Sequence, residues 1–203
     1  MQYLHLSDEE LTRQIVNGNR LNAFGELFDR YLLKIYNKCL MFVELPAKAE
    51  DLTYDIFMRA FINLKETDHI VNFRTWFYGI AYGMCLEYAQ IDYKQNNNAY
   101  WELNEIEKNR VKVFHCNAEE QLLNLEADQL KKILKKLHPQ DRLILLMRYQ
   151  DSADFSTIAK QLNINESDVQ VNLNRALERA VAIYHKLINS YKSNEQIKIA
   201  KSL

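Results

Sequence analysis

The sequence predicts an all-α protein made of two small helical domains joined by a linker. The 203 residues include only 4 Gly and 2 Pro, whereas these two residues together make up roughly 12% of ordinary proteins. Along most of the chain, apolar residues recur every three or four positions, which is typical of helices with one buried face. So few turn residues argue against a β-sandwich, and also against a Rossmann or P-loop enzyme with its Gly-rich phosphate loop.

Four helices are predicted in the first domain, residues 1–94. The first begins at a capping box formed by Ser7 and Glu10, whose groups can satisfy each other's backbone donors, and it ends at residues 17–19 (Asn-Gly-Asn). The other three are expected over residues 21–43, 47–64 and 73–93, with a polar loop at residues 65–72. Leu45-Pro46 separates the second helix from the third, because the residue before a proline avoids the helical region.

The composition changes after residue 94, and residues 95–117 are predicted to form the linker. The second domain, residues 118–203, again shows helical periodicity. Helices are expected over residues 118–137, 143–148, 155–162 and 166–191, and the tail at 190–203 either extends the last helix or frays.

The strongest local pattern lies between Phe155 and Leu173. Two short apolar stripes are separated by the tight turn at residues 163–165, and the small Ala159 lets the two helices cross closely. This spacing predicts a helix-turn-helix, whose second helix fits the DNA major groove. An ordinary αα-hairpin is the alternative. The inward positions are Ile158, Ala159, Leu162, Val169 and Leu173.

Aromatic residues cluster at the start of the predicted fourth helix, where Phe73, Trp76 and Phe77 follow the polar loop. Aromatic rings at such a position can stack on unpaired bases. The alternative is that they belong to the core, as aromatic stripes at helical spacing usually do.

The balance of charges indicates no general affinity for nucleic acid. Lys and Arg number 26 and Asp and Glu 27, for a formal net charge of −1, so no global basic field is expected. Cys39, Cys85 and Cys116 lack metal-ligand spacing and are expected to be reduced thiols, buried as small apolar groups. We expect no metal, cofactor or enzymatic activity, no signal peptide or membrane insertion, and a cytoplasmic location.

Several motifs occur in a fixed order, and together they resemble a bacterial sigma factor of the extracytoplasmic-function (group 4) type, in the sigma-70 family. The resemblance covers nearly the whole chain. Segments similar to sigma region 2 are residues 7–11, 22–28, 51–60 and 73–81, and those similar to region 4 are residues 137–149 and the predicted helix-turn-helix.

The resemblance implies a non-enzymatic specificity subunit of RNA polymerase. Region 2, residues 1–94, would bind core polymerase and the −10 promoter element, and region 4 would bind the −35 element. An anti-sigma factor is a possible further partner. The third helix would dock on the polymerase clamp through one face, consisting of Asp51, Tyr54, Asp55, Met58 and Arg59.

The same resemblance assigns the contacts with promoter DNA. The melted −10 element would be received by Glu66, Thr67, Asp68, His69, Phe73, Arg74 and Trp76, with core packing as a second role for Trp76. The −35 groove would be contacted by Ser167, Gln170, Val171, Asn172, Asn174 and Arg175. Amides suit adenine, guanidinium suits guanine and methyl groups suit thymine. Arg142 and Arg148 would reach phosphates, although a structural ion pair is the alternative for Arg148.

The sequence departs from the family pattern where basic residues are usual. Tyr82-Gly83 stands where Arg-Asn is common, and residues 170–172 are Gln-Val-Asn where Lys-Ser or Lys-Ser-Arg is usual. Each lost phosphate contact removes affinity that comes from counterion release, so DNA binding by the chain alone should be weak. Two alternatives remain open: a sigma-like adaptor with weakened promoter reading, and a stand-alone helix-turn-helix regulator.

Overall fold

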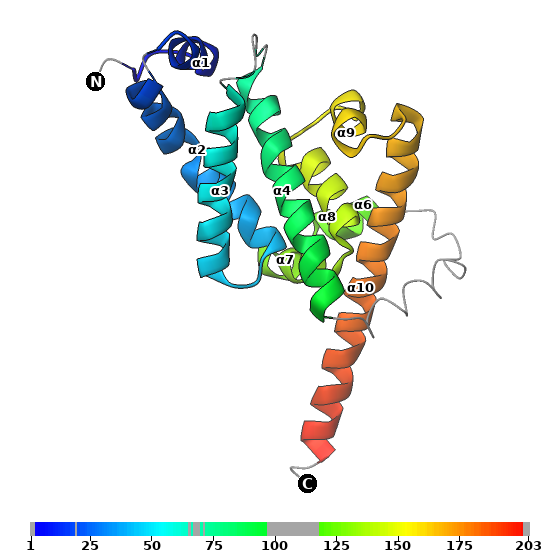
Figure 1. The fold of residues 1–203 in the computed structure, drawn as a ribbon. Coiled ribbons are helices and arrows are strands. Elements are labelled where there is room, and N and C mark those ends of the chain that lie inside the picture. Colours follow the sequence, from blue (N-terminus) through cyan, green and yellow to red (C-terminus); the bar gives the residue numbers. More distant parts are fainter. Residues whose placement is uncertain are drawn as a thin grey trace. The chain divides into compact units, whose positions relative to one another are not determined.

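The computed structural model describes residues 3–18, 20–64, 66, 70, 72–96 and 118–200. The chain divides into two compact units, Met1–Gln95 and Asn96–Leu203, whose helices are labelled in Figure 1. All regular structure in the described residues is helical, which confirms the predicted all-α class. The predicted linker falls almost wholly outside the described residues, so its boundaries stay a prediction.

The first unit contains four helices in the described residues, as expected. They are α1 (Asp8–Val16), α2 (Arg20–Phe42), α3 (Pro46–Leu64) and α4 (Phe73–Asn96). The predicted capping box is present, since Ser7 Oγ accepts from the Glu10 N–H and the Ser7 N–H donates to Glu10 Oε2 at 2.7 Å. Pro46 stands at the first position of α3, where its missing N–H removes no helical hydrogen bond.

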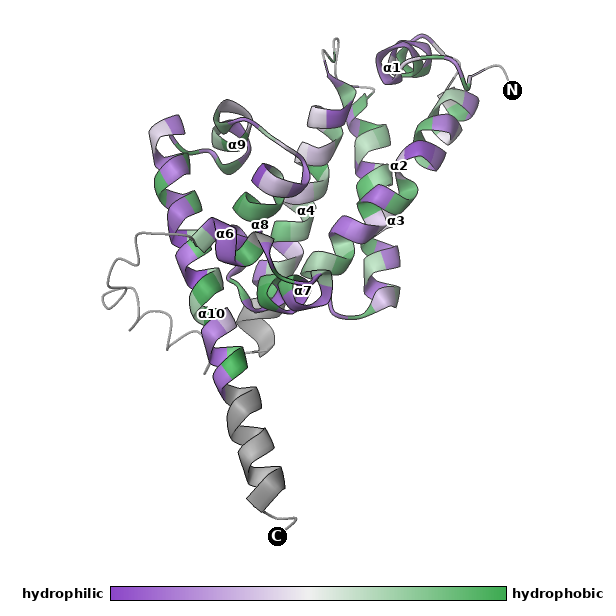
Figure 2. Ribbon diagram, turned by 180° about the vertical axis from the view of Figure 1, so that it is seen from behind, coloured by the Kyte–Doolittle hydropathy of each residue, from purple (hydrophilic) through white to green (hydrophobic). Residues whose placement is uncertain are grey.

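An aromatic cluster joins α2, α3 and α4 in the core of the first unit. The ring of Phe77 lies 5.0 Å from Phe57 and 5.4 Å from Phe73, centroid to centroid, and Tyr31 lies 5.5 Å from both Phe73 and Phe77. Figure 2 shows hydrophobic residues along much of α2, α3 and α4. Core packing is therefore the role of most of the aromatic residues that open the fourth helix.

A buried lysine and a pair of buried thiols lie between α2 and α4. The amino group of Lys38 donates to Tyr82 Oη at 2.9 Å and lies 4.4 Å from the centre of the Tyr78 ring, an arrangement that favours a cation. Cys39 and Cys85 are buried with their sulfurs 3.9 Å apart, as expected for packed thiols. The hydrogen bond with Cys39, and burial after it, raise the pKa of Cys85. Cys116 lies outside the described residues.

The described helices of the second unit run in the order α6 (Ala118–Leu123), α7 (Ala127–Lys136), α8 (Pro139–Leu145), η1 (a π-helix, Leu146–Gln150), α9 (Phe155–Leu162) and α10 (Glu166–Ala200). Two predicted boundaries were wrong. The single helix expected over 118–137 is two helices, because Glu126 adopts an extended backbone before α7. The next helix begins at Pro139, since His138 Nδ1 accepts from the Gln140 N–H. Of the two alternatives for the tail, extension of the last helix is the one observed, because α10 continues to Ala200.

The helix-turn-helix is formed by α9 and α10. Asp154 Oδ1 accepts from the Thr157 N–H at 2.7 Å at the start of α9, and this hydrogen bond lowers the pKa of Asp154. Asn163 ends α9 in the left-handed region with φ 53°, a conformation that Asn tolerates better than most residues. Ile158 and Val169 are fully buried and hold the two helices together. The sequence pattern predicted this element correctly.

Candidate functional site

The predicted polymerase-binding residues share one exposed face of α3. Leu52, Ile56 and Ala60 are buried on the opposite side, which leaves the remaining positions for solvent. Tyr54 is 56% exposed and Met58 57%, unusually high for large apolar side chains. The face consists of Asp51, Tyr54, Asp55, Met58 and Arg59, all of them exposed.

A shallow groove between α2 and α3 continues this face, and the sequence did not reveal it. Its volume is about 270 Å³, and its lining residues are Leu32, Leu33, Tyr36, Glu50, Thr53 and Tyr54. The Tyr54 ring stacks on Phe28 with 6.1 Å between centroids, which holds the groove wall in place. Leu33 is 68% exposed. The available signal was the Leu32-Leu33 pair, since Tyr31 and Ile35 already occupy the inward positions of this turn.

One residue predicted to contact the −10 element lies in the core instead. Phe73 is only 2% exposed and is packed between Tyr31 and Phe77, so its ring has no free face for a base. This prediction was wrong, because the aromatic residue that opens a helix can be covered by a residue distant in sequence, here Tyr31 of α2.

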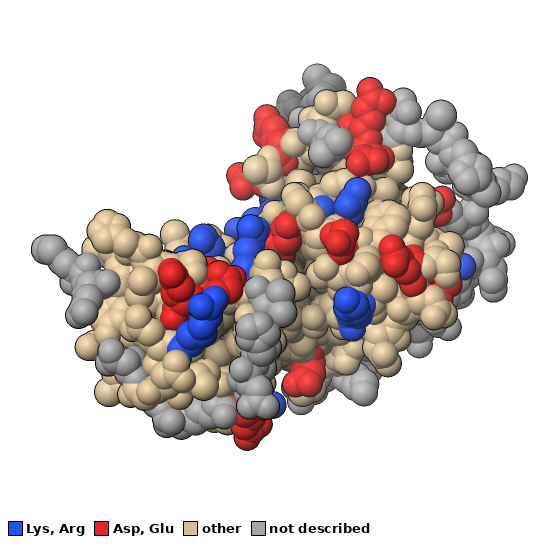
Figure 3. All heavy atoms as spheres, turned by 90° about the horizontal axis from the view of Figure 1, so that it is seen from above, with Lys and Arg blue, Asp and Glu red and all other residues tan. Residues whose placement is uncertain are grey.

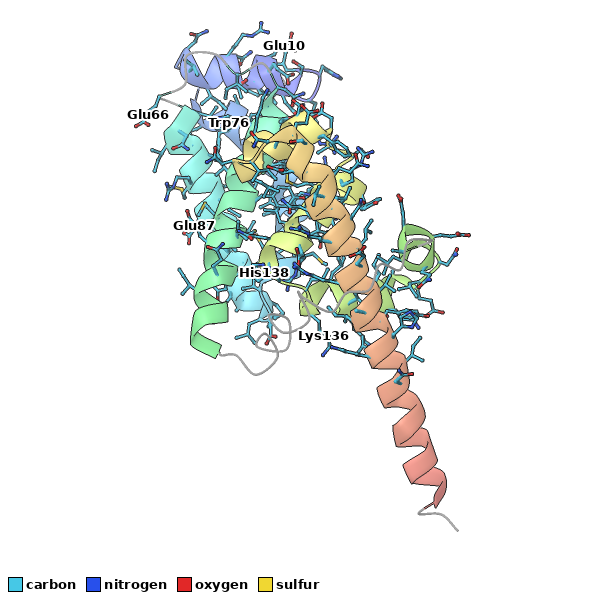
Figure 4. The ribbon with its side chains drawn as sticks, turned by 90° about the vertical axis from the view of Figure 1, so that its right-hand side faces the viewer. Glu10, Glu66, Trp76, Glu87, Lys136 and His138 are labelled. Atoms are coloured by element: carbon cyan, nitrogen blue, oxygen red, sulfur yellow. The ribbon has the colours of Figure 1, made fainter. Side chains whose placement is uncertain are left out.

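Other predicted −10 residues remain at the surface where α3 ends and α4 begins. Arg74 is exposed, with its guanidinium carbon 5.4 Å from the centre of the Tyr78 ring, and Trp76 is half-buried against Phe73. Figure 4 shows Glu66 and Trp76 at this end of the unit, and Glu66 is exposed in a turn. Thr67, Asp68 and His69 lie outside the described residues.

The first turns of α10 present a polar face to solvent. Leu173 and Ala176 are buried with Val169 on the inner side. Val171 is 47% exposed, and Asn172 is half-buried at the margin of this recognition face. The predicted −35 residues that are exposed on it are Ser167, Gln170, Val171, Asn174 and Arg175.

Arg142 has a structural role, and its predicted phosphate contact was wrong. The side chain is 7% exposed. Its Nε donates to the Leu134 carbonyl at 2.6 Å, and its Nη2 donates to the carbonyls of Lys135 at 2.7 Å and Leu137 at 3.0 Å. These carbonyls stand at the end of α7, where the last carbonyls of a helix lack helical partners, and the Leu134 carbonyl also accepts from the Leu137 N–H at 3.1 Å. The guanidinium therefore joins the end of α7 to α8.

Arg148 lies at the surface and takes part in the local fold. Its Nη1 donates to the Ala153 carbonyl at 3.1 Å, and its guanidinium carbon lies 5.2 Å from the centre of the Phe155 ring. The side chain is exposed, so a contact with phosphate stays a prediction. The partner in the structure is a carbonyl, in place of the carboxylate expected for an ion pair.

The surface electrostatics agree with the balanced composition. On the face that Figure 3 shows, Lys and Arg alternate with Asp and Glu and do not gather in one basic field. The recognition face of α10 begins with two exposed carboxylates, Glu166 and Asp168. In the described ranges, no cluster of His, Cys, Asp and Glu is arranged to hold a metal, and no helix is long and apolar enough to cross a membrane.

The chain has two helical units, and the second contains a helix-turn-helix with an exposed polar face on its second helix, an arrangement typical of DNA-binding proteins. Two family models match the chain: Sigma-70 region 2 over residues 27–90 and Sigma-70, region 4 over residues 127–179. Together they cover more than half of it. The chain belongs to the sigma-70 family, and it is an RNA polymerase sigma factor for transcription initiation.

Sigma factors of the extracytoplasmic-function (ECF) group in Bacillus subtilis (strain 168) are similar to this chain. The ECF RNA polymerase sigma factor SigW is 24% identical over 173 residues, which cover 82% of this chain and 90% of SigW. SigM, of the same group, is 23% identical over 167 residues, covering 82% of this chain and 98% of SigM.

Solved structures share the fold. CnrH, in complex with the cytosolic domain of CnrY, matches with a TM-score of 0.61 and 19% identity over 88% of this chain and 97% of that one. The sigma factor RpoE of Bartonella quintana, in complex with the anti-sigma factor NepR, matches with a TM-score of 0.55 and 15% identity, over 80% of this chain and 97% of that one.

The buried role of Arg142 predicts a loss of stability when its donors are removed. Arg142→Met keeps the aliphatic stem but removes the charged donor from three carbonyls at the end of α7, so we expect the free energy of unfolding to fall by roughly 2–4 kcal/mol. Urea denaturation would measure this, and hydrogen exchange in α7 would locate it. The matched control is Arg148→Met at the surface. Equal losses in the two variants would contradict the structural role of Arg142.

Proposed function

We propose that the first unit of this sigma factor binds core RNA polymerase and the melted −10 element, while α10 of the second unit enters the −35 major groove. The observation that carries the proposal is the outward face of α10 directly after a helix-turn-helix turn. Its exposed groups are amides, a guanidinium and a branched apolar side chain, which are the groups that read base edges.

The −35 contacts divide by chemistry. The amides of Gln170 and Asn174 suit the paired donor and acceptor of adenine, Arg175 suits guanine, and the methyl groups of Val171 suit a thymine methyl. All four side chains are exposed, which supports simultaneous contact with one stretch of groove. Asn172, half-buried, is better placed to support its neighbours than to reach a base.

The −10 contacts are proposed for the exposed groups around the start of α4. Arg74 can bind a phosphate or stack on a base through its guanidinium plane, and the uncovered part of the Trp76 ring offers a stacking surface. Glu66, in the turn after α3, can accept from an exocyclic amine of an unpaired base. Thr67, Asp68 and His69 stay candidates by sequence.

Core polymerase is proposed to bind the exposed face of α3 together with the groove between α2 and α3. Tyr54, Met58 and Leu33 supply apolar contact area, and Asp51 and Asp55 supply negative charge. Interfaces of this kind combine a few buried anchors with a charged rim that sets orientation. The complementary surface should carry an apolar side chain for the groove and basic groups opposite the carboxylates.

Promoter binding is proposed to depend on polymerase, because the recognition face carries little positive charge. Glu166 and Asp168 place two carboxylates in the first turn of α10, ahead of Arg175, and this negative charge opposes the attraction to phosphates. Polymerase presents both units to one promoter, and the resulting effective concentration can offset weak individual contacts. The same carboxylates favour the second candidate function, a sigma-like adaptor with weakened promoter reading.

Two further assignments extend the proposal. The structural neighbours CnrH and RpoE were solved with the cytosolic domain of CnrY and with the anti-sigma factor NepR, which supports an anti-sigma partner for this chain as well. We also infer that it acts in the cytoplasm, where RNA polymerase meets DNA, and that it has no catalytic chemistry of its own.

Run-off transcription with core polymerase tests the proposal against the adaptor. The templates are promoters upstream of the chain's own operon, followed by fragments that cover the genome. We expect transcripts with discrete start sites only when the chain is added, because it supplies the promoter contacts that core polymerase lacks. Binding to core polymerase without initiation on any fragment would favour the adaptor.

Charge reversal on α3 should weaken core binding. In the double variant Asp51→Lys and Asp55→Lys, two exposed carboxylates become cations that repel a basic partner, so we expect the dissociation constant for core polymerase to rise about tenfold or more. The measurement is fluorescence anisotropy of labelled protein with core polymerase. Glu87→Lys, an exposed position on α4, is the control. An unchanged affinity in the double variant would remove α3 from the interface.

Substitutions on the recognition face should change the choice of −35 sequence. Gln170→Ala and Arg175→Ala each remove one base contact, so we expect about a tenfold loss of initiation on the preferred −35 sequence and a relaxed preference at one base pair. The check is run-off transcription on a library of −35 variants. His185→Ala, exposed farther along α10, is the control. Loss of core binding with an unaltered promoter choice would contradict the groove assignment.

A further inference from the structure

The first turn of α4 is hydrogen-bonded to a side chain from the first turn of α1. The Phe73 N–H is one of the donors that a helix leaves unpaired at its N-terminus. It donates to Glu9 Oε1 at 3.3 Å, across 64 residues of sequence. A second donor of the same turn, the Thr75 N–H, is paired locally with Asn72 Oδ1 at 2.8 Å. The first turn of α4 is thus capped partly by its own segment and partly by α1.

The side chain of Phe73 is connected to α1 as well. Its ring packs against Tyr31, whose hydroxyl donates to Asp8 Oδ2 at 2.5 Å. Burial, followed by this hydrogen bond, raises the pKa of Tyr31, so the phenol keeps its proton and remains a donor. Two adjacent carboxylates of α1 are therefore connected to Phe73. Glu9 accepts from its backbone N–H, and Asp8 accepts from Tyr31, whose ring packs on the Phe73 ring.

The carboxylate of Asp8 is itself fixed in position. Arg30 Nη1 donates to Asp8 Oδ1 at 2.8 Å, and Arg30 Nε donates to Glu26 Oε1 at 2.9 Å. The same guanidinium reaches the carbonyls of Tyr3 and Leu4 at 3.3 Å each. The segment before α1 and the first turn of α1 are in this way bound to α2, and through Tyr31 to α4.

The turn that α1 holds is the turn that presents Arg74 and Trp76. Arg74 follows Phe73 directly, and Trp76 lies three residues after it and packs on its ring. Figure 4 shows Glu10 of α1 and Trp76 of α4 at the same end of the unit. A change in the position of Phe73 would therefore move both side chains that we assign to the −10 element.

We propose that Glu9, supported by Asp8 and Tyr31, is a positioning residue that sets the first turn of α4 for capture of the melted −10 element. The inference rests on the proposed function of this end of the unit. Glu9 touches no DNA in this scheme. It acts through the Phe73 amide, and its negative charge also suits the positive end of the α4 dipole.

Two substitutions of Glu9 separate positioning from charge. Glu9→Gln keeps a side-chain oxygen that can accept from the Phe73 N–H, whereas Glu9→Ala removes it. In holoenzyme assembled with core polymerase, on a promoter identified by run-off transcription, we expect Glu9→Ala to reduce the open-complex fraction about fivefold, the size typical of a lost helix cap. We expect Glu9→Gln to retain most of it. Permanganate reactivity of thymines in the −10 element measures the open complex.

Two matched variants test whether the effect on the open complex is specific to the contacts between α1 and the start of α4. Tyr31→Phe removes only the hydroxyl that reaches Asp8, so it should lower the open-complex fraction in the same direction with the core intact. Glu87→Ala, an exposed carboxylate on α4 itself, should leave it unchanged. Core affinity of Glu9→Ala should stay close to that of the wild type, and its thermal midpoint should fall by no more than the few degrees that one lost helix cap costs.

Three results would overturn the inference while leaving the sigma function in place. The first is an open-complex fraction for Glu9→Ala equal to that of the wild type. The second is a parallel fall in core affinity and thermal midpoint, which would make Glu9 a residue of general stability. The third is an equal effect of Glu87→Ala. Failure of the wild-type holoenzyme to open any promoter would instead contradict the proposed function.

Discussion

The contact of three helices through one aromatic cluster is the constraint on which the first unit depends. The rings of Phe57 of α3 and Tyr31 of α2 both pack against Phe77 of α4. Large buried aromatic side chains dominate the energetics of a small core. Because the inner faces of these helices pack against one another, the outer face of α3 and the first turn of α4 are held in fixed orientations. The surfaces assigned to polymerase and to melted DNA are therefore consequences of how the core is filled.

Elements whose signals are local could be predicted from the sequence. The helix-turn-helix follows from Ile158, Val169 and the turn at Asn163, all within a dozen residues, and the outward faces of α3 and α10 follow from helical periodicity alone. The break between α6 and α7 could not be predicted in the same way. The periodicity continues across residues 124–126, and only the backbone turn before Ala127 divides the pattern.

Predicted site residues lie at the surface only where no tertiary contact buries them. Gln170, Asn174 and Asp55 are exposed because their own helix turns them outward. Phe73 and Arg142 belong to the core because other helices bind them: Tyr31 of α2, distant in sequence, covers the ring, and the carbonyls at the end of the preceding helix, α7, bind the guanidinium. Aromatic and Arg side chains suit contacts with DNA, but they also suit core packing and helix capping. The sequence alone does not distinguish these roles, because they depend on the tertiary contacts.

Lys38 has a consequence for how the molecule meets a polyanion. Its amino group lies between the rings of Tyr78 and Tyr82, and with Arg142 it places two positively charged side chains inside the protein. Both are included in the 26 Lys and Arg residues of the sequence, but neither is available at the surface. An approaching nucleic acid therefore encounters fewer cations than the composition suggests, and discrimination among DNA sequences would have to come from shape and hydrogen bonding more than from attraction at a distance.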